Sequence, residues 1–350
     1  MTQDSKPAVL VTGGAGYIGA HTAKALHERG FIPVVFDNLQ SGFREAVQWG
    51  PFVHGYIADS VALRAAITAH DVKAVIHFAG LIEVGRSTKR PDLFWDVNVA
   101  GTITLLTVMR ECGVGRLVFS SSAAVYGQSE RGSQAAIVEE DAKAPVSPYG
   151  DTKLAAEWMI AAQCRAYGLR GVALRYFNAA GADASGLIGE AHEPETHLIP
   201  LAIAAALGDG PALTVFGQDF DTPDGTCLRD YVHVTDLAAA HVAALEVELA
   251  EGAFEAVNVG TGQGCSVMQV LAAVGKAAGA PVPYTVGPRR AGDPPSLVAS
   301  PDRAKALLGW TPSHSSLDEI AADALRWERS PAYGTGLRRA DGPRRARIGL

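Results

Sequence analysis

Short apolar runs alternate with longer amphipathic stretches along the first half of the chain. The runs in AVLVTGG, PVVFDN, AVIHFAG, RLVFSSS and GVALRYF are nearly continuous, which is typical of parallel strands buried on both faces. Between the first two lies HTAKALHERG, which predicts a helix that ends at Gly30. Strands separated by helices predict an α/β fold with a Rossmann-type, doubly wound parallel sheet. Such a sheet binds its ligand at the carboxyl ends of the strands.

The pattern changes after about residue 176. Loops lengthen, and Gly, Pro and Asp become frequent, as in FNAAGADASGLIGEAHEPETH. Helices are predicted at THLIPLAIAAAL, from Asp236 through HVAALEVEL, and at SVMQVLAAVGKAAG, where Ser266 and Gln269 have capping-box spacing. We therefore expect a Rossmann domain followed by a smaller mixed α/β lobe that binds the substrate. The predicted units are 1–176, then 177–333 with a helix near 235–250 packing back on the first domain, and a basic tail at 334–350.

Composition and charge narrow the class of protein. The 350 residues are 48% hydrophobic and 19% charged, which is enough for a sizeable core. A net charge of -7 argues against a nucleic-acid partner. The N-terminus has no signal-peptide pattern, and no apolar stretch is long enough to span a bilayer, so we expect a cytoplasmic protein without a membrane partner. The four cysteines form no CxxC pair, and we predict neither a metal site nor a disulfide framework.

A glycine-rich turn follows the first predicted strand. Gly13, Gly16 and Gly19 stand three residues apart and lead into the first helix. Glycine permits a tight turn and a close approach of backbone to pyrophosphate, and the helix N-terminus attracts phosphate. Asp37 ends the second strand about 20 residues further on, where a carboxylate accepts from ribose hydroxyls and repels a 2′-phosphate. The turn and Asp37 together predict NAD rather than NADP.

Tyr149 and Lys153 stand at i and i+4 at the start of a predicted helix, so their side chains share one face. A phenol has a pKa of about 10, and lowering it by ~3 units takes about 4 kcal/mol of preferential stabilisation of the phenolate. A nearby ammonium and a cationic nicotinamide can supply that. Ser122 ends the strand RLVFSSS and can hydrogen-bond a reacting hydroxyl. These three residues are the predicted catalytic group.

The chain resembles the UDP-glucose (UDP-galactose) 4-epimerases, a branch of the extended short-chain dehydrogenase/reductase family. The matching motifs are VTGGAGYIG, VIHFAG, VNVAGT, FSSSAAVYG, SPYGDTK, LRYFNAAGA, LRDYVHV, NVGTG and PRRAGD, in the expected order over roughly residues 9–325. The resemblance implies that Tyr149 takes the proton of the sugar 4-hydroxyl while hydride passes from C4 to tightly held NAD and then returns to the other face. It also implies a homodimer joined by helices near 98–112 and 150–166.

The resemblance further assigns residues to the two ligands. Lys153 would activate Tyr149 and bind the ribose, Arg229 and Arg290 would hold the two UDP phosphates, Asp293 the uridine ribose and Phe216 the uracil. The residues expected at NAD are Gly13, Gly16, Tyr17, Ile18, Gly19, Asp37, Asn38, Phe78, Ala79, Gly80, Asn98, Ser120, Tyr149, Lys153 and Tyr176. Those expected at the UDP-sugar are Ser122, Tyr149, Phe177, Asn178, His197, Leu198, Phe216, Arg229, Arg290, Asp293 and Leu297.

Four positions depart from the family pattern. Ile82 replaces a lysine that contacts the cofactor ribose. Tyr56 replaces an aspartate that meets the adenine, and Asp59 is a candidate to compensate for it. His197 replaces an asparagine near the substrate diphosphate, and Leu297 replaces a tyrosine that restricts the C2 side of the sugar in some relatives. The smaller Leu297 predicts room for an N-acetyl group.

Other activities share the fold, the Tyr–Lys pair and NAD. A 4,6-dehydratase needs an acidic pair after the strand-end hydroxyl, but Ser122 is followed by Ala123 and Ala124, which cannot transfer protons. UDP-N-acetylglucosamine and UDP-pentose 4-epimerases use the same hydride chemistry and stay open as alternatives. A non-catalytic NAD-binding sensor is a further alternative, although such proteins typically lose the Tyr or the Lys.

Overall fold

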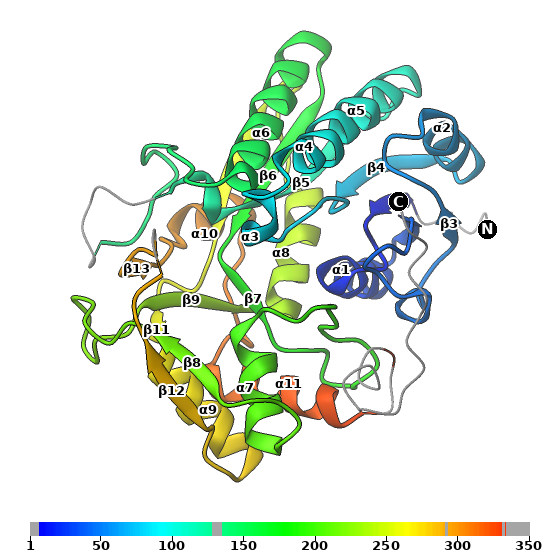
Figure 1. Ribbon diagram of the computed structural model, residues 1–350. Coiled ribbons are helices and arrows are strands. Elements are labelled where there is room, and N and C mark those ends of the chain that lie inside the picture. The colour runs from blue at the N-terminus through cyan, green and yellow to red at the C-terminus, as the bar shows by residue number, and fades with distance from the viewer. Residues whose placement is uncertain (1–6, 128–134, 291–292, 331–332, 334–350) are drawn as a thin grey trace.

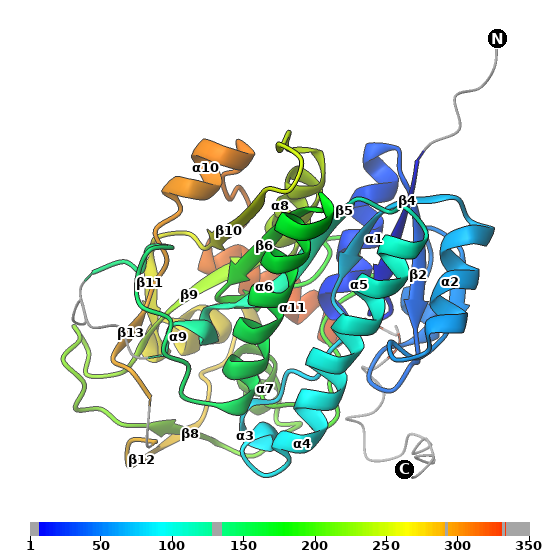
Figure 2. The same ribbon diagram turned by 90° about the horizontal axis from the view of Figure 1, so that it is seen from above.

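The computed structural model describes residues 7–127, 135–290, 293–330 and 333, and the predicted basic tail lies outside them. Its main feature is a parallel sheet of seven strands in the order β10-β6-β5-β4-β1-β2-β3 (Figures 1 and 2). The strands are β1 (Ala8–Thr12), β2 (Ile32–Asp37), β3 (Phe52–His54), β4 (Val72–His77), β5 (Arg116–Ser122), β6 (Arg170–Tyr176) and β10 (Phe254–Val259). The order of the first six strands is that of a dinucleotide-binding sheet, which confirms the predicted fold class.

Helices cover both faces of this sheet, which explains why its strands are almost wholly apolar. Leu10 of β1 joins the core on one face, while Val9 and Val11 join the core on the other. The first face carries α2 (Ser60–Ala69), α5 (Gly101–Glu111) and α6 (Pro148–Tyr167), and the second carries α1 (Tyr17–Arg29), α8 (Val234–Glu246) and α10 (Asp302–Leu308). The alternation of side chains along each strand thus supplies both cores.

The first sheet includes a strand from far along the chain. β10 pairs with β6 in parallel register, from Phe254 opposite Gly171 to Val259 opposite Tyr176. The polarity pattern did not predict this strand. The helix before it, α8, packs against α1 and against the sheet. Residues 234–259 therefore complete the first sheet and one of its helical layers, although they follow most of the second lobe in sequence.

The second lobe is smaller and mixed. Its core is formed by three helices and the small strands beside them (Figure 1). Ser266 caps α9, and the predicted capping box with Gln269 is present. The helices are α7 (Leu198–Leu207), α9 (Val267–Ala278) and α11 (Leu317–Arg329). The strands form a mixed sheet of β7 (Asn178–Ala180), β9 (Leu228–His233), β11 (Gly264–Ser266) and β13 (Ser296–Leu297), and a parallel pair of β8 (Leu213–Phe216) and β12 (Tyr284–Gly287).

Several short elements connect these layers. They are the 3-10 turns η1 (Arg44–Ala46) and η3 (Ala123–Val125), the short helices α3 (Val84–Ser87) and α4 (Pro91–Phe94), and the π-helical turn η2 (Trp95–Ala100). Within the described residues, no helix combines the length and apolarity needed to cross a membrane. All four cysteines lie in that part of the chain and are unpaired there.

Candidate functional site

The glycine turn lies where the strand order reverses, between β1 and β4. Gly13 has φ 72°, and a Cβ placed on it would approach the backbone nitrogen of Ala79 to 2.6 Å. A Cβ on Gly19 would approach the Gly13 carbonyl oxygen to 2.3 Å. Glycine is therefore required at both positions because the loop after β4 and the start of α1 press against the turn.

The first turn of α1 is suited to an anion. Among the described residues, no side chain caps this helix at Gly16, and the first turn contains no acid. Its free N–H groups and positive dipole end therefore face the turn. The Tyr17 hydroxyl donates to the Gly181 carbonyl at 2.6 Å, so the Tyr17 ring anchors the second lobe. Tyr17 and Ile18 can then serve a phosphate only through their backbone N–H groups.

Asp37 lies beside the turn at the end of β2. Its carboxylate accepts from the backbone N–H of Ala15 at 3.0 Å and from that of Leu39 at 2.7 Å. Burial raises the pKa of this carboxyl, and these hydrogen bonds act in the opposite direction. Each oxygen keeps a lone pair for a ribose hydroxyl, so the chemistry fits the expected role. Asn38 uses its side-chain oxygen to accept from the N–H of Gln40 at 3.0 Å.

Asn98 joins the loop after β4 to the helix of the catalytic pair. Its amide oxygen accepts from the N–H of Leu81 at 2.7 Å, while its Nδ2 donates to the Leu81 carbonyl and to the Thr152 hydroxyl, each at 3.1 Å. A Cβ on Gly80 would lie 3.0 Å from the same amide oxygen. Asn98 thus fixes the backbone that follows Phe78 and Ala79.

Tyr149 and Lys153 lie in the first turns of α6, beside the end of β5. Ser147 caps this helix by accepting from the Gly150 N–H at 3.2 Å. The ammonium of Lys153 is buried and donates to the Ser120 carbonyl at 2.8 Å. Burial lowers the pKa of Lys153 to about 8. The Ser120 hydroxyl lies 2.5 Å from that of Tyr176, so these two strand-end residues are also brought to the pair.

The phenol of Tyr149 is neutral at pH 7 in the protein alone. Burial raises its pKa, and a hydrogen bond with Ser122 acts in the opposite direction. Ser122 is fixed in turn because its hydroxyl oxygen accepts from the Ala124 N–H at 3.1 Å. The Lys153 nitrogen lies 5.8 Å from the Tyr149 ring centroid. The predicted role of Tyr149 as a base would therefore need positive charge in addition to that of Lys153.

A buried ionic network behind the pair was not predicted from the sequence. Glu157, one turn after Lys153, forms a two-pronged ion pair with Arg175 of β6, with N–O distances of 2.9 and 2.6 Å. The Ser121 hydroxyl donates to the same carboxylate at 2.5 Å. Arg175 also donates to the Tyr126 hydroxyl at 2.8 Å. The network ties α6 to β5, β6 and the turn after Ser122, and fixes the helix that carries Tyr149 and Lys153.

A second buried group ties β1 to β4. His77 Nε2 lies 3.0 Å from the Thr102 hydroxyl, which itself donates to the Asn98 carbonyl at 2.6 Å. Thr102 must therefore accept from His77, whose Nδ1 then accepts from the Thr12 hydroxyl at 2.7 Å. Burial lowers the pKa of His77 to about 3, so it is neutral.

The residues expected at the UDP moiety form two contacts in the second lobe. The Arg290 guanidinium lies 4.0 Å from the centroid of the Phe216 ring. Arg229 lies 3.6 Å from the Asp293 carboxylate and donates to the Pro294 carbonyl at 3.0 Å. Two cations, an aromatic ring and a carboxylate thus lie at the ends of β8 and β9 and in the loop before β13.

Leu297 and Phe177 pack against the same cluster, which contains Val125 and Tyr126 from the turn after Ser122. Leu297 therefore packs beside the turn that follows Ser122. Asn178 begins β7, opposite Tyr231 of β9. These contacts bring the expected sugar residues to the boundary between the two lobes.

His197 and Leu198 lie at the start of α7. Leu198 packs on the second core. The His197 Nδ1 contacts the carboxylate of Glu190, which the sequence did not single out. Burial opposes the charged form of His197, but Glu190 outweighs it and raises the pKa of the imidazole. One ring nitrogen of His197 is therefore already engaged.

The positions near the expected cofactor that depart from the family pattern differ in their exposure and contacts. Ile82 is exposed, beyond the backbone that Asn98 fixes. Tyr56 follows β3 and is half-buried. Asp59 caps α2, accepting from the N–H groups of Val61 and Ala62, both at 3.0 Å. This capping role gives Asp59 a structural function at the position that was considered as a compensation for Tyr56.

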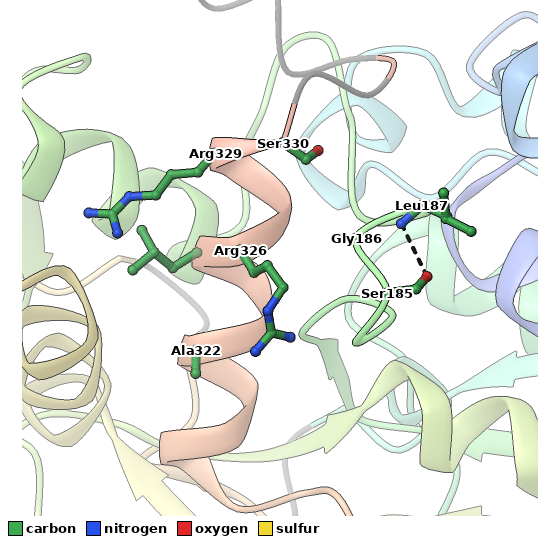
Figure 3. Close-up of a pocket in the computed structure, with 8 residues that line it drawn as sticks. Ser185, Gly186, Leu187, Ala322, Arg326, Arg329 and Ser330 are labelled. Atoms are coloured by element: carbon green, nitrogen blue, oxygen red, sulfur yellow. Dashed lines mark hydrogen bonds between the residues drawn. The ribbon is translucent and has the colours of Figure 1, made fainter.

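A cavity of about 780 Å³ lies elsewhere, between α11 and the loop at 185–187 (Figure 3). It is lined by Ser185, Gly186, Leu187, Ala322, Leu325, Arg326, Arg329 and Ser330. Figure 3 shows the Ser185 side chain turned to its own loop, where its hydroxyl accepts from the Leu187 N–H at 3.3 Å. None of these lining residues belongs to the predicted NAD or UDP-sugar site, so this cavity is separate from that site.

Comparison with known proteins identifies the family to which this fold and glycine turn belong. Residues 9–260 match the model of the NAD dependent epimerase/dehydratase family. The chain belongs to that family. NAD is accordingly its cofactor, as the glycine turn and Asp37 predicted.

Members of the family resemble the chain over nearly its whole length. The UDP-glucose 4-epimerase of Halalkalibacterium halodurans is 46% identical over 95% of this chain and 99% of that protein. That of Rhizobium leguminosarum bv. trifolii is 48% identical over 91% and 96%. The structure of the Brucella ovis UDP-glucose 4-epimerase in complex with NAD has a TM-score of 0.87 and 48% identity, covering 91% and 97%. The Bifidobacterium longum enzyme with NAD+ and UDP has a TM-score of 0.86 and 37% identity, covering 92% and 98%.

Proposed function

We propose that the chain is an isomerase that interconverts the 4-epimers of a UDP-sugar, with UDP-glucose and UDP-galactose as its substrates. One observation carries the proposal: Ser122 interacts with Tyr149 in the direction that lowers the pKa of the phenol, and Ala123 and Ala124, which follow Ser122, cannot transfer protons. Proton transfer is therefore provided at one hydroxyl only. The relatives named above as UDP-glucose 4-epimerases support the choice of substrate.

Each catalytic side chain has a defined task in this reaction. NAD, when bound, supplies the acceptor and donor of a hydride at C4 of the sugar. Tyr149 accepts the proton of the 4-hydroxyl as C4 is oxidised and returns it when C4 is reduced on the opposite face. Lys153 provides the positive charge that favours the phenolate. Ser122 holds the reacting hydroxyl against Tyr149 and hydrogen-bonds to the phenol.

The second lobe would hold the UDP moiety. Arg229 and Arg290 would bind the diphosphate, because the guanidinium fork pairs two phosphate oxygens at once. Phe216 would stack on uracil, and its contact with Arg290 keeps the aromatic surface beside the cation. Asp293 would accept from the uridine ribose, and its contact with Arg229 holds the loop that carries it.

The test uses purified enzyme without added NAD. Separate incubations with UDP-glucose, UDP-N-acetylglucosamine and UDP-xylose are followed by chromatographic quantification of the 4-epimers. We expect UDP-galactose from UDP-glucose, and product formation slowed by about 10²–10⁴-fold in the Tyr149→Phe variant. Bound nucleotide without turnover of any UDP-sugar would contradict the proposal and favour the sensor.

Leu297 motivates a test of a second substrate, UDP-N-acetylglucosamine. This side chain lies by the turn after Ser122, where a larger ring would narrow the space around the sugar. We expect Leu297→Tyr to reduce kcat/KM for UDP-N-acetylglucosamine more than for UDP-glucose. Equal effects on both substrates would contradict the role of Leu297, and turnover of UDP-xylose would extend the activity to pentoses.

We also propose a homodimer joined through α5 and α6, which lie side by side (Figure 2). Large apolar side chains on these helices are exposed: Ile103 to 49% and Trp158 to 65%. Large exposed apolar side chains on two adjacent helices favour an interface at this face. Light scattering should give the mass of a dimer for the native chain and that of a monomer for Trp158→Glu.

A further inference from the structure

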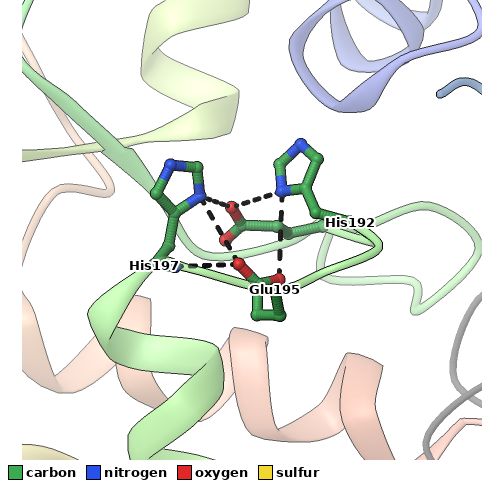
Figure 4. Close-up of side chains that lie close together, drawn as sticks. His192, Glu195 and His197 are labelled. Atoms are coloured by element: carbon green, nitrogen blue, oxygen red, sulfur yellow. Dashed lines mark hydrogen bonds and ion pairs between the residues drawn. The ribbon is translucent and has the colours of Figure 1, made fainter. Parts of the chain in front are cut away.

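Two Glu-x-His pairs converge in the loop before α7. Glu190 and His192 form the first pair, and Glu195 and His197 form the second. Each of the four residues offers one ligand atom, and these four atoms all lie within 4.8 Å of one another. Figure 4 shows the two imidazoles directed toward the carboxylate groups from opposite sides. The prediction of no metal site rested on cysteine spacing and did not consider this cluster.

The separations are close to those of a tetrahedral cation site. Zinc binds imidazole nitrogen and carboxylate oxygen at about 2.0–2.2 Å, so the edges of its tetrahedron measure about 3.4 Å. The His192 Nδ1 lies 3.2 Å from Glu190 and 3.8 Å from Glu195. The His197 Nδ1 lies 3.7 Å from Glu195 and is closer to Glu190. A cation at the centre of these atoms requires the contact between His197 and Glu190 to lengthen.

One ligand atom of the cluster is buried beside the two carboxylates. The His192 Nδ1 is buried, and among the described residues it has no partner in hydrogen-bond geometry, despite its short approach to Glu190. Glu195 is held in place because its Oε1 accepts from the N–H groups of Thr196 at 2.8 Å and of His197 at 2.9 Å. The backbone thus pre-positions the Glu195 carboxylate, as outer-shell hydrogen bonds usually do for metal ligands.

We propose that Glu190, His192, Glu195 and His197 form a structural site for a divalent transition cation of the Zn²⁺ class. Two imidazoles and two carboxylates give four ligands with no open position, which is the pattern of a structural rather than a catalytic site. The two carboxylate charges balance the charge of the cation. Imidazole ligands disfavour Mg²⁺ and Ca²⁺, which prefer oxygen. The proposal does not depend on the substrate of the enzyme.

The cation would fasten the loop to three helices. His197 directly precedes α7. The Glu190 carbonyl accepts from the Trp327 indole of α11 at 2.7 Å. The Tyr17 ring of α1 lies edge-on to His192, with ring centroids 6.4 Å apart. Binding would therefore link the start of the cofactor helix α1 to the second lobe.

The experiment measures binding of the metal alone to the full-length enzyme. After chelator treatment and gel filtration, the protein is titrated with Zn²⁺ by calorimetry and with Co²⁺ by visible absorption, where tetrahedral sites give intense bands. His192→Gln and Glu195→Gln remove one ligand each. Glu190 is more deeply buried and is left unchanged to protect the fold. His314→Gln is the matched control, because His314 forms a pair with Glu319 at 2.7 Å without convergent ligands.

We expect one equivalent of Zn²⁺ per chain, tetrahedral Co²⁺ bands, and a melting temperature that rises with metal concentration. His192→Gln and Glu195→Gln should each weaken binding at least tenfold, while His314→Gln should bind like the native chain. Absence of binding to the folded native chain would overturn the proposal. Equal binding by all variants would also overturn it, since the metal would then reside elsewhere, for example at cysteine.

Discussion

Replacement of Lys153 by methionine should stabilise the protein while it abolishes activity. The ammonium is buried, and burial lowers its pKa from 10.5 to about 8. Below pH 8 the folded state must carry this charge, at a cost of about 3 kcal/mol relative to the unfolded chain. Methionine fills a similar volume without the charge, but the Ser120 carbonyl loses the donor that lies 2.8 Å away. The lost hydrogen bond costs about 1 kcal/mol, so the unfolding free energy should rise by about 2 kcal/mol at pH 7.

The gain should vanish as the pH rises. Between the folded pKa of about 8 and the unfolded pKa of 10.5, the unfolded chain binds more protons than the folded chain, so the native protein gains stability with pH. At pH 9.5 the cost of the buried charge has fallen to about 1 kcal/mol, which the lost hydrogen bond offsets. The Lys153→Met variant and the native protein should then be equally stable.

The assay is urea unfolding followed by tryptophan fluorescence, at pH 7 and pH 9.5. Both proteins are freed of nucleotide first, because bound NAD would add its own stabilisation. Lys89→Met, at an exposed position, is the control and should change the unfolding free energy by less than about 0.5 kcal/mol. A Lys153→Met variant that is less stable than the native protein at pH 7, or a difference that does not change with pH, would refute the reasoning.

Three further outcomes follow from the same site. Tyr149→Phe should lower kcat by about 10²–10⁴-fold and leave the unfolding free energy nearly unchanged, since only the proton-transferring hydroxyl is lost; epimer quantification and urea unfolding measure both. Ser122→Ala should move the pH–rate profile to higher pH, because its hydrogen bond opposes the rise in the pKa of Tyr149; an unmoved profile would contradict this role. Glu157→Gln should cost about 3–5 kcal/mol by leaving Arg175 buried without its partner. A Glu157→Gln, Arg175→Met double variant should cost less than the sum of the single changes, as an unfolding double-mutant cycle would test.

Local patterns predicted the first sheet and its glycine turn well. Consecutive apolar strands, the C-terminal Gly30 of α1 and the capping box of Ser266 depend on residues close in sequence, and the structure has all three. The turn requires glycine at Gly13 and Gly19 because of backbone contacts that the motif already encodes. The resemblance then pointed to side chains from distant segments, among which Arg290 and Phe216 are in contact.

The missed features depend on contacts between distant segments. Nothing local to Glu157 or Arg175 indicates that they pair, because the pairing arises from the packing of α6 on β6. Burial raises the pKa of Tyr149 in the protein alone, which no sequence pattern reports. The lowering expected with the nicotinamide bound stays a prediction. The repeated Glu-x-His spacing was visible in the sequence. Its convergence depends on the fold of the loop.

The position of β10 has a consequence for synthesis. A ribosome would release residues 1–176 before Phe254–Val259, yet β6 acquires its last neighbour only from the later segment. Until then β6 is an open sheet edge, and the face that α8 later covers exposes Val172 and Leu174 to water. Unpaired edges and uncovered apolar faces promote aggregation. A shortened gene ending at 176 would therefore yield an insoluble product, and the cofactor half matures only as part of a nearly complete polypeptide.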